Sequence, residues 1–187
     1  ASQWNKAIPL LKRLETEADY PQNVIYAQSN LMNAYYQLQN YAEAEAYAEK
    51  VLAKSNLETK VKSDAQIIIA RSAMKTGNES KAKSAYVTVE KIATGALAAE
   101  ALFYNAYFKN KEGNFEVSNT VIQKLAKDYS SYKYYSAKGL VVMAKNFYAL
   151  KDAFQATYIL ESVITNFAEF NDVVTEAQTE LNKIKTE

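Results

Sequence analysis

The chain has 187 residues and a net charge of +1, with 49% hydrophobic and 23% charged residues and only 4 glycines and 2 prolines. This composition favours a mostly helical protein that is long enough to bury a core. Cysteine and histidine do not occur in the sequence, which excludes disulfides, zinc sites with nitrogen or sulfur ligands, thiol nucleophiles and histidine acid–base catalysis.

The first predicted helix lies within residues 1–19, where Trp4, Ala7, Leu11 and Leu14 share one face. The same offsets of 3, 7 and 10 residues recur in sets that begin at Tyr41, Glu79, Phe115 and Ala153. The second member of each set is small and falls at positions 7, 44, 82, 118 and 156, which are 37, 38, 36 and 38 residues apart. A near-constant period of this length indicates a repeat protein.

Segments with a second apolar stripe lie between these helices, and a small residue recurs in them at Ala70, Ala106 and Ala144. We name each of these segments helix A of its repeat. The helices with offsets of 3, 7 and 10 residues are named helix B. Small residues on both allow two helix axes to approach closely. We therefore expect antiparallel A–B hairpins, each of which covers the apolar face of its neighbour.

Short turn sequences separate helix A from helix B. Gly77-Asn78 and Gly113-Asn114 combine a residue that accepts the left-handed conformation with a residue that caps the next helix. Gln39-Asn40 and Lys151-Asp152 stand at the corresponding places without glycine.

The expected fold class is all-α, an α-solenoid of about ten helices. We expect a single solenoid over residues 1–187, which begins with a half repeat at 1–19 that contains helix B only. Four repeats follow at 20–55, 56–93, 94–129 and 130–168, and a capping helix at 171–187 closes the chain.

The stretch Asn40-Tyr41-x-Glu43-Ala44, followed by Val51-Leu52, resembles helix B of a tetratricopeptide repeat. Met143, Ala144 and Phe147 match the order of a large, a small and an aromatic residue on the family's helix A. The period of 36–38 residues departs from the family's value of about 34. The resemblance implies a right-handed superhelix whose A helices line a concave groove for an extended peptide or a helix.

A narrower likeness concerns residues 134–156, which are similar to the last repeat of long bacterial cell-envelope tetratricopeptide proteins. It favours the periplasm or cell envelope over the cytoplasm. The first B helix has no A partner and the last segment has the pattern of a capping helix, which together favour the view that this chain is the C-terminal part of a longer protein. No stretch approaches the roughly 20 apolar residues of a membrane span, so we expect no direct membrane insertion by these residues.

Carrying the family's concave face over by position yields a surface that mixes aromatic and cationic side chains and has few acids. Its members are Tyr26, Asn33, Tyr36, Arg71, Lys75, Phe103, Tyr107, Asn110, Lys138, Lys145 and Tyr148. This set suggests a protein or peptide partner, such as an acidic or C-terminal peptide. Chaperone-binding members of the family hold the terminal carboxylate of a peptide with lysine, asparagine and arginine side chains of helix A. Such a carboxylate site is disfavoured here, because Ser29 stands where those members have a lysine.

The function predicted from these observations is that of a non-enzymatic protein–protein interaction scaffold. No phosphate-binding glycine pattern and no oxygen-ligand loop is present, so no cofactor or metal is expected, and the net charge of +1 argues against nucleic acid. The acidic residues Glu43, Glu45 and Glu49 are expected to form a solvated helix face. The alternative is a structural solenoid that forms a weak homodimer through its N-terminal end, with Trp4, Leu10 and Leu11.

Overall fold

The computed structural model describes residues 2–186 and confirms the predicted α-solenoid. Within this range the chain forms ten α-helices and no strand, and consecutive helices pack as neighbours on either side of the boundary between residues 93 and 94. The helices are α1 (Ser2–Glu17), α2 (Pro21–Gln37), α3 (Tyr41–Leu52), α4 (Thr59–Lys75), α5 (Glu79–Ile92), α6 (Gly95–Lys111), α7 (Phe115–Asp128), α8 (Lys133–Ala149), α9 (Ala153–Asn166) and α10 (Asn171–Thr186).

The A helices repeat with the same length and nearly the same spacing. Helices α2, α4, α6 and α8 each contain 17 residues, and they begin 38, 36 and 38 residues apart. The B helices α3, α5, α7 and α9 begin with the same three steps. A residue in one A helix can therefore be compared with its counterpart in another by counting positions from the first residue of each helix.

The turns from helix A to helix B share one backbone feature, a residue in the left-handed conformation. A residue with positive φ follows each A helix: Gln39 at 60°, Gly77 and Gly113 at 77°, and Lys151 at 69°. The next residue caps helix B in three of these four turns, where the Asn40, Asn78 or Asp152 side chain accepts a hydrogen bond from a backbone N–H of the first turn. Gln39 and Lys151 thus adopt the conformation for which glycine is usually chosen.

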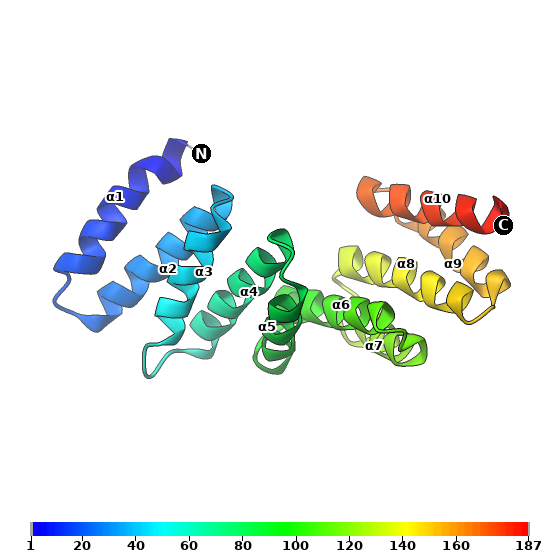
Figure 1. Cartoon of the computed structure of the whole chain (residues 1–187), viewed down its shortest axis with the longest axis horizontal. Helices are drawn as coiled ribbons and strands as arrows, with labels where there is room; N and C mark the ends of the chain where they lie inside the picture. The colour runs from blue at the N-terminus through cyan, green and yellow to red at the C-terminus, as the bar shows by residue number, and fades with distance from the viewer. Residues whose placement is uncertain (1, 187) are drawn as a thin grey trace. The chain divides into compact units, whose positions relative to one another are not determined.

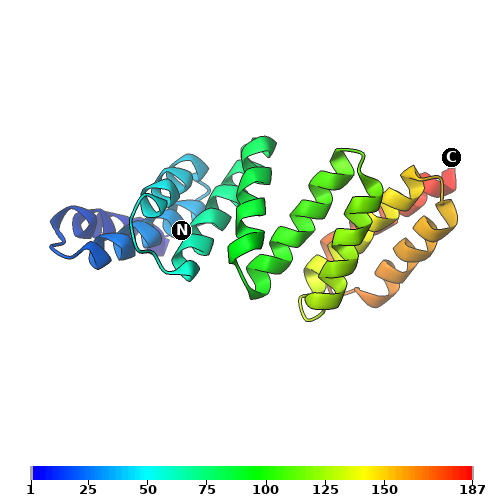
Figure 2. The ribbon, with the colours of Figure 1, turned by 90° about the horizontal axis from the view of Figure 1, so that it is seen from below.

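Two compact units divide the chain, with the boundary between Ala93 and Thr94. Unit 1 contains α1–α5, and in it α2 packs against α1, α3 and α4. Unit 2 contains α6–α10, and in it α8 packs against α6, α7, α9 and α10. Both ribbon views show the two helices of a hairpin side by side within each unit (Figures 1 and 2).

Ala7 of the first helix is half-buried, whereas the other small residues that reveal the repeat are buried. Their side chains have 0% exposure at Ala44, Ala70, Ala82, Ala106, Ser118, Ala144 and Ala156. The approach of α8 to α7 is so close that a Cβ added at Gly139 would lie 3.2 Å from Ile122 Cγ2. Close packing at such positions is the physical reason why small residues, and not large apolar ones, occupy the facing sides of helices A and B.

Candidate functional site

The residues predicted to line a groove fall in both units. Unit 1 holds Tyr26, Asn33 and Tyr36 on α2 and Arg71 and Lys75 on α4. Unit 2 holds Phe103, Tyr107 and Asn110 on α6 and Lys138, Lys145 and Tyr148 on α8.

Phe103 is a core residue, which corrects its predicted place on an exposed surface. Its side chain is 4% exposed and belongs to the hydrophobic cluster of α6, α7 and α8. The ring centroid lies 6.1 Å from that of Tyr135 on α8 and 6.5 Å from that of Tyr107. Lys138 places its Nζ 4.8 Å from the centre of the Phe103 ring. Since α6 and α8 pack side by side, a large residue here fills the junction between them.

Lys145 already has acidic partners within unit 2. Its Nζ lies 2.6 Å from Glu176 Oε1 and 3.7 Å from Glu180 Oε1, both on α10. Another carboxylate of α10, that of Asp172, accepts a hydrogen bond of 2.7 Å from the Tyr134 hydroxyl. Burial and this hydrogen bond raise the pKa of Tyr134 to about 12. The capping helix therefore neutralises a cation that was expected to attract an external acidic partner.

A buried polar network ties α8 to α6 and α7. Asn146 is 0% exposed, and its Nδ2 donates to Ser118 Oγ and to Asn119 Oδ1, both at 2.8 Å. Its Oδ1 accepts from Asn110 Nδ2 at 2.7 Å. Ser118 Oγ in turn donates to the Ala106 carbonyl at 2.8 Å. Asn110 is therefore engaged within the fold, and the network is satisfied as buried polar groups require.

A pocket of about 340 Å³ opens in unit 1 between α2 and α4, beside the loop that precedes α4. We call it the α2–α4 pocket. Its lining residues are Gln22, Ile25, Tyr26, Ser29, Asn56, Leu57, Glu58 and Val61. Tyr26 is 60% exposed at the rim, whereas Leu57 is buried.

Ser29 explains why the pocket is there. Position 9 of the four A helices is occupied by Ser29, Ile67, Phe103 and Val141, and serine is the smallest of these. Ser29 Oγ is buried and finds no hydrogen-bond partner among the residues that the structure describes. Ser29 thus contributes neither bulk nor a side-chain hydrogen bond at the α2–α4 junction.

The counterpart of the pocket in unit 2 is filled. Val61 is position 3 of α4, and position 3 of α8 is Tyr135. The contact between Phe103 and Tyr135 therefore occupies the place in unit 2 where Ser29 and Val61 line a hollow in unit 1. Aligning position 9 of the repeats is the sequence signal that would have revealed this difference.

Cationic residues follow the pocket along α4. Arg71 and Lys75 lie 10 and 14 residues after Val61, which places them about 15 and 21 Å further along the helix at a rise of 1.5 Å per residue. Lys75 is exposed and Arg71 is half-buried. Near the pocket itself, Lys60 forms an ion pair of 2.6 Å with Asp64.

The other two predicted residues of α2 make local contacts. Asn33 Nδ2 donates to the Ser29 carbonyl at 2.9 Å, so this donor serves its own helix. The Tyr36 ring packs edge-on against Tyr41, with ring centroids 5.6 Å apart.

Glu15 links three helices of unit 1. It accepts hydrogen bonds from Gln28 Nε2 at 2.9 Å, Tyr47 OH at 3.2 Å and Lys50 Nζ at 3.2 Å. Burial alone would raise the pKa of Glu15, but these hydrogen bonds outweigh it and hold the pKa below its usual value. Burial, followed by the nearby Glu15 charge, raises the pKa of Tyr47 to about 12.

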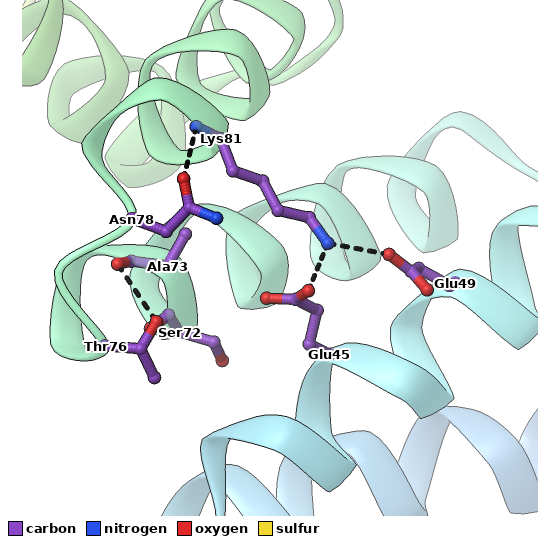
Figure 3. A network of polar contacts seen from close by, with 7 residues as sticks. All are labelled: Glu45, Glu49, Ser72, Ala73, Thr76, Asn78 and Lys81. Carbon is purple, nitrogen blue, oxygen red and sulfur yellow. Dashed lines mark hydrogen bonds and ion pairs between the residues drawn. The ribbon is translucent and has the colours of Figure 1, made fainter.

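Two residues of the acidic cluster on α3, Glu45 and Glu49, belong to an ion-pair network, which corrects for these two the expectation of a solvated face, whereas Glu43 is exposed. Figure 3 shows the Lys81 ammonium of α5 between the carboxylates of Glu45 and Glu49. The hydrogen bonds to Glu45 and Glu49 raise the pKa of Lys81. The Asn78 side chain accepts a hydrogen bond from the Lys81 backbone N–H at 3.1 Å. The backbone of Lys81 therefore takes part in the cap of α5, while its side chain links α5 to α3.

None of the helices in residues 2–186 is both long enough and apolar enough to cross a membrane. The same residues contain no group of three or more acidic side chains arranged to hold a metal ion. Comparison of the chain with models of known protein families finds no match, and comparison with curated proteins finds none either.

Proposed function

We propose that the protein is a non-enzymatic scaffold of tetratricopeptide type that binds an extended segment of a protein partner through the A-helix face of unit 1. The observation that carries this proposal is the α2–α4 pocket, where a small residue at position 9 leaves a hollow between two neighbouring A helices. Pockets of about 300–1,000 Å³ are typical of ligand sites. The tetratricopeptide likeness of the sequence supports the choice of a peptide as ligand.

The charge distribution supports an acidic partner in unit 1 more than in unit 2. Lys145 of unit 2 is held by two carboxylates of α10. Lys75 of unit 1 is exposed one helical turn beyond Arg71. Charges of this kind at the edge of a binding site set the association rate and its salt dependence more than they set the affinity.

The test uses an array of immobilised 12-residue peptides with randomised composition, probed with the fluorescently labelled protein at low salt. The wild type is expected to retain acidic peptides. The double reversal R71E/K75E is expected to lose them, because both cations of α4 become repulsive. The matched control K124E/K127E makes the same charge change on the B helix α7, where both lysines are exposed, and should keep the wild-type pattern.

Two results would contradict the proposal. The wild type and R71E/K75E could retain the same peptides, or the array could retain none. Circular dichroism at rising temperature must accompany the array, so that a lost fold is not mistaken for a lost site.

One observation favours the alternative of a self-associating solenoid. Leu10 on α1 is 69% exposed, the largest exposed fraction among the leucine, isoleucine and valine side chains that the structure describes. Sedimentation velocity at rising protein concentration distinguishes this function, because a weak dimer through α1 should dissociate in the variant L10S. A monomer at all concentrations would remove this alternative and leave the peptide-binding proposal intact.

A further inference from the structure

We propose that the α2–α4 pocket binds one aromatic side chain, phenylalanine or tyrosine, of an extended peptide segment. The inference rests on the proposed function and names the group that the partner inserts.

The first argument is the position of the hollow in the repeat. In unit 2 the chain itself fills the junction of two A helices with the aromatic ring of Phe103, which is 4% exposed. In unit 1 the residue at the same helix position is Ser29, and the residue opposite is Val61 in place of Tyr135. Both junctions are thus formed by A helices of equal length in the same register, but the ring that fills the junction in unit 2 has no counterpart in unit 1.

The second argument is the chemistry of the lining. Ile25, Leu57 and Val61 supply aliphatic surface, and Tyr26 supplies a ring at the rim that is 60% exposed. A second ring that enters the pocket can pack against Tyr26 edge-on or offset, and such pairs add to the gain from burial alone. The unit 2 counterpart shows the same type of contact, since Phe103 packs against the rings of Tyr104, Tyr107 and Tyr135.

The third argument is size. A hollow of about 340 Å³ lies near the lower end of the range for ligand sites. One large side chain with its flanking backbone suits this volume better than a whole folded element does. The rest of the peptide would then lie across the exposed A-helix face of unit 1, where Lys75 is exposed.

The experiment uses small amides in place of an unidentified partner. N-acetyl-phenylalaninamide and N-acetyl-tyrosinamide are titrated into ¹⁵N-labelled full-length chain, with N-acetyl-leucinamide and N-acetyl-alaninamide as comparisons. The aromatic amides are expected to shift the backbone amide signals around Ser29 and Val61, with saturation at concentrations on the order of 1 mM. The leucine amide is expected to bind about three- to tenfold more weakly, because it lacks a ring to pack against Tyr26.

Three variants locate the effect. S29F places the ring of unit 2 into the pocket and should abolish the shifts, whereas S29A leaves the pocket open and should preserve them. V61Y restores the other member of the unit 2 pair, Tyr135, and should also abolish the shifts. V61Y therefore decides the matter if S29F does not fold.

The outcomes separate this inference from the proposed function. Absence of saturable shifts with the aromatic amides overturns the inference, and so does equal binding of the leucine amide or persistence of binding in a folded S29F or V61Y. The variant R71E/K75E should bind the aromatic amides as the wild type does, because the probes carry no charge. An array that retains acidic peptides without aromatic preference would support the proposed function while it contradicts the aromatic pocket.

Discussion

Units 1 and 2 contain A helices of identical length, but the junction between two of these helices differs in its side chains. In unit 2, Phe103 and Tyr135 fill the α6–α8 junction, and the Tyr135 hydroxyl donates to buried Glu100 at 2.7 Å. In unit 1, Ser29 leaves the α2–α4 junction hollow, and Tyr26 stands exposed where unit 2 has Glu100. The comparison teaches that a junction between two 17-residue A helices is filled or hollow according to the volume of a few side chains.

The largest effect is expected from opening the filled junction. Phe103→Ser should cost about 3–5 kcal/mol of unfolding free energy, because it removes a buried ring and leaves a cavity. Urea denaturation followed by circular dichroism measures the loss. The control Tyr26→Ser removes an exposed ring at position 6 of α2 and should change the free energy by less than about 0.5 kcal/mol. Equal losses in the two variants would show that the two junctions do not differ in packing.

An intermediate effect is expected from alkaline pH, and it should affect both units. Tyr47 of unit 1 and Tyr134 of unit 2 each have a folded pKa of about 12, against an ordinary value of 10.0. Because the folded pKa is raised, the stabilisation is fully present below pH 10 and is lost as the pH rises from 10 to 12. The loss should be about 2–3 kcal/mol for buried Tyr47 and less for the more exposed Tyr134.

Denaturation between pH 9 and pH 12, with the wild type beside Tyr47→Phe and Tyr134→Phe, measures this contribution. Each variant should show a flatter decline of stability with pH than the wild type does. Parallel curves for all three proteins would mean that neither hydroxyl is held in its protonated form by the fold.

The smallest effect should have opposite signs in the two units. Ser29→Ala removes a buried hydroxyl without a partner and should raise the unfolding free energy by about 1 kcal/mol or less. Ser118→Ala removes a hydroxyl that bonds to Asn146 and to the Ala106 carbonyl, and should lower it by about 1–2 kcal/mol, because Asn146 keeps its bond to Asn119. Thermal melts of the two alanine variants test the contrast. A destabilised Ser29→Ala would reveal a hydrogen bond of Ser29 in solution.

The helical repeat was predictable from the sequence because its signals are local. The spacing of small residues follows from the period of a helix, and each of Ala44, Ala82 and Ala156 is buried as predicted. The turns were predictable for the same reason, since Gln39 and Lys151 stand in register with two glycines and adopt positive φ as they do.

The site was less predictable because it depends on what lies beside each helix. Phe103 was expected on the surface, since one helix considered alone does not reveal that α8 covers this position. Lys145 was expected to meet an external acid, but the acids come from α10, 31 and 35 residues further along the chain. The α2–α4 pocket was missed because it arises from the small volume of Ser29. A pattern of apolar residues shows which positions carry large side chains, but it does not show where a large side chain is lacking.

The buried amide of Asn146 has a consequence for folding. A chain of similar hairpins can misassemble when one hairpin docks on the wrong neighbour. The positions of Ser118 and Asn119 on α7, which satisfy Asn146, are occupied by Ala82 and Lys83 on α5. Docking α8 against α5 would leave the Asn146 amide buried without these partners, at a cost of about 1–3 kcal/mol. One polar side chain thus distinguishes the correct neighbour from its near copy, and it penalises shuffled repeats in which α8 meets the wrong B helix.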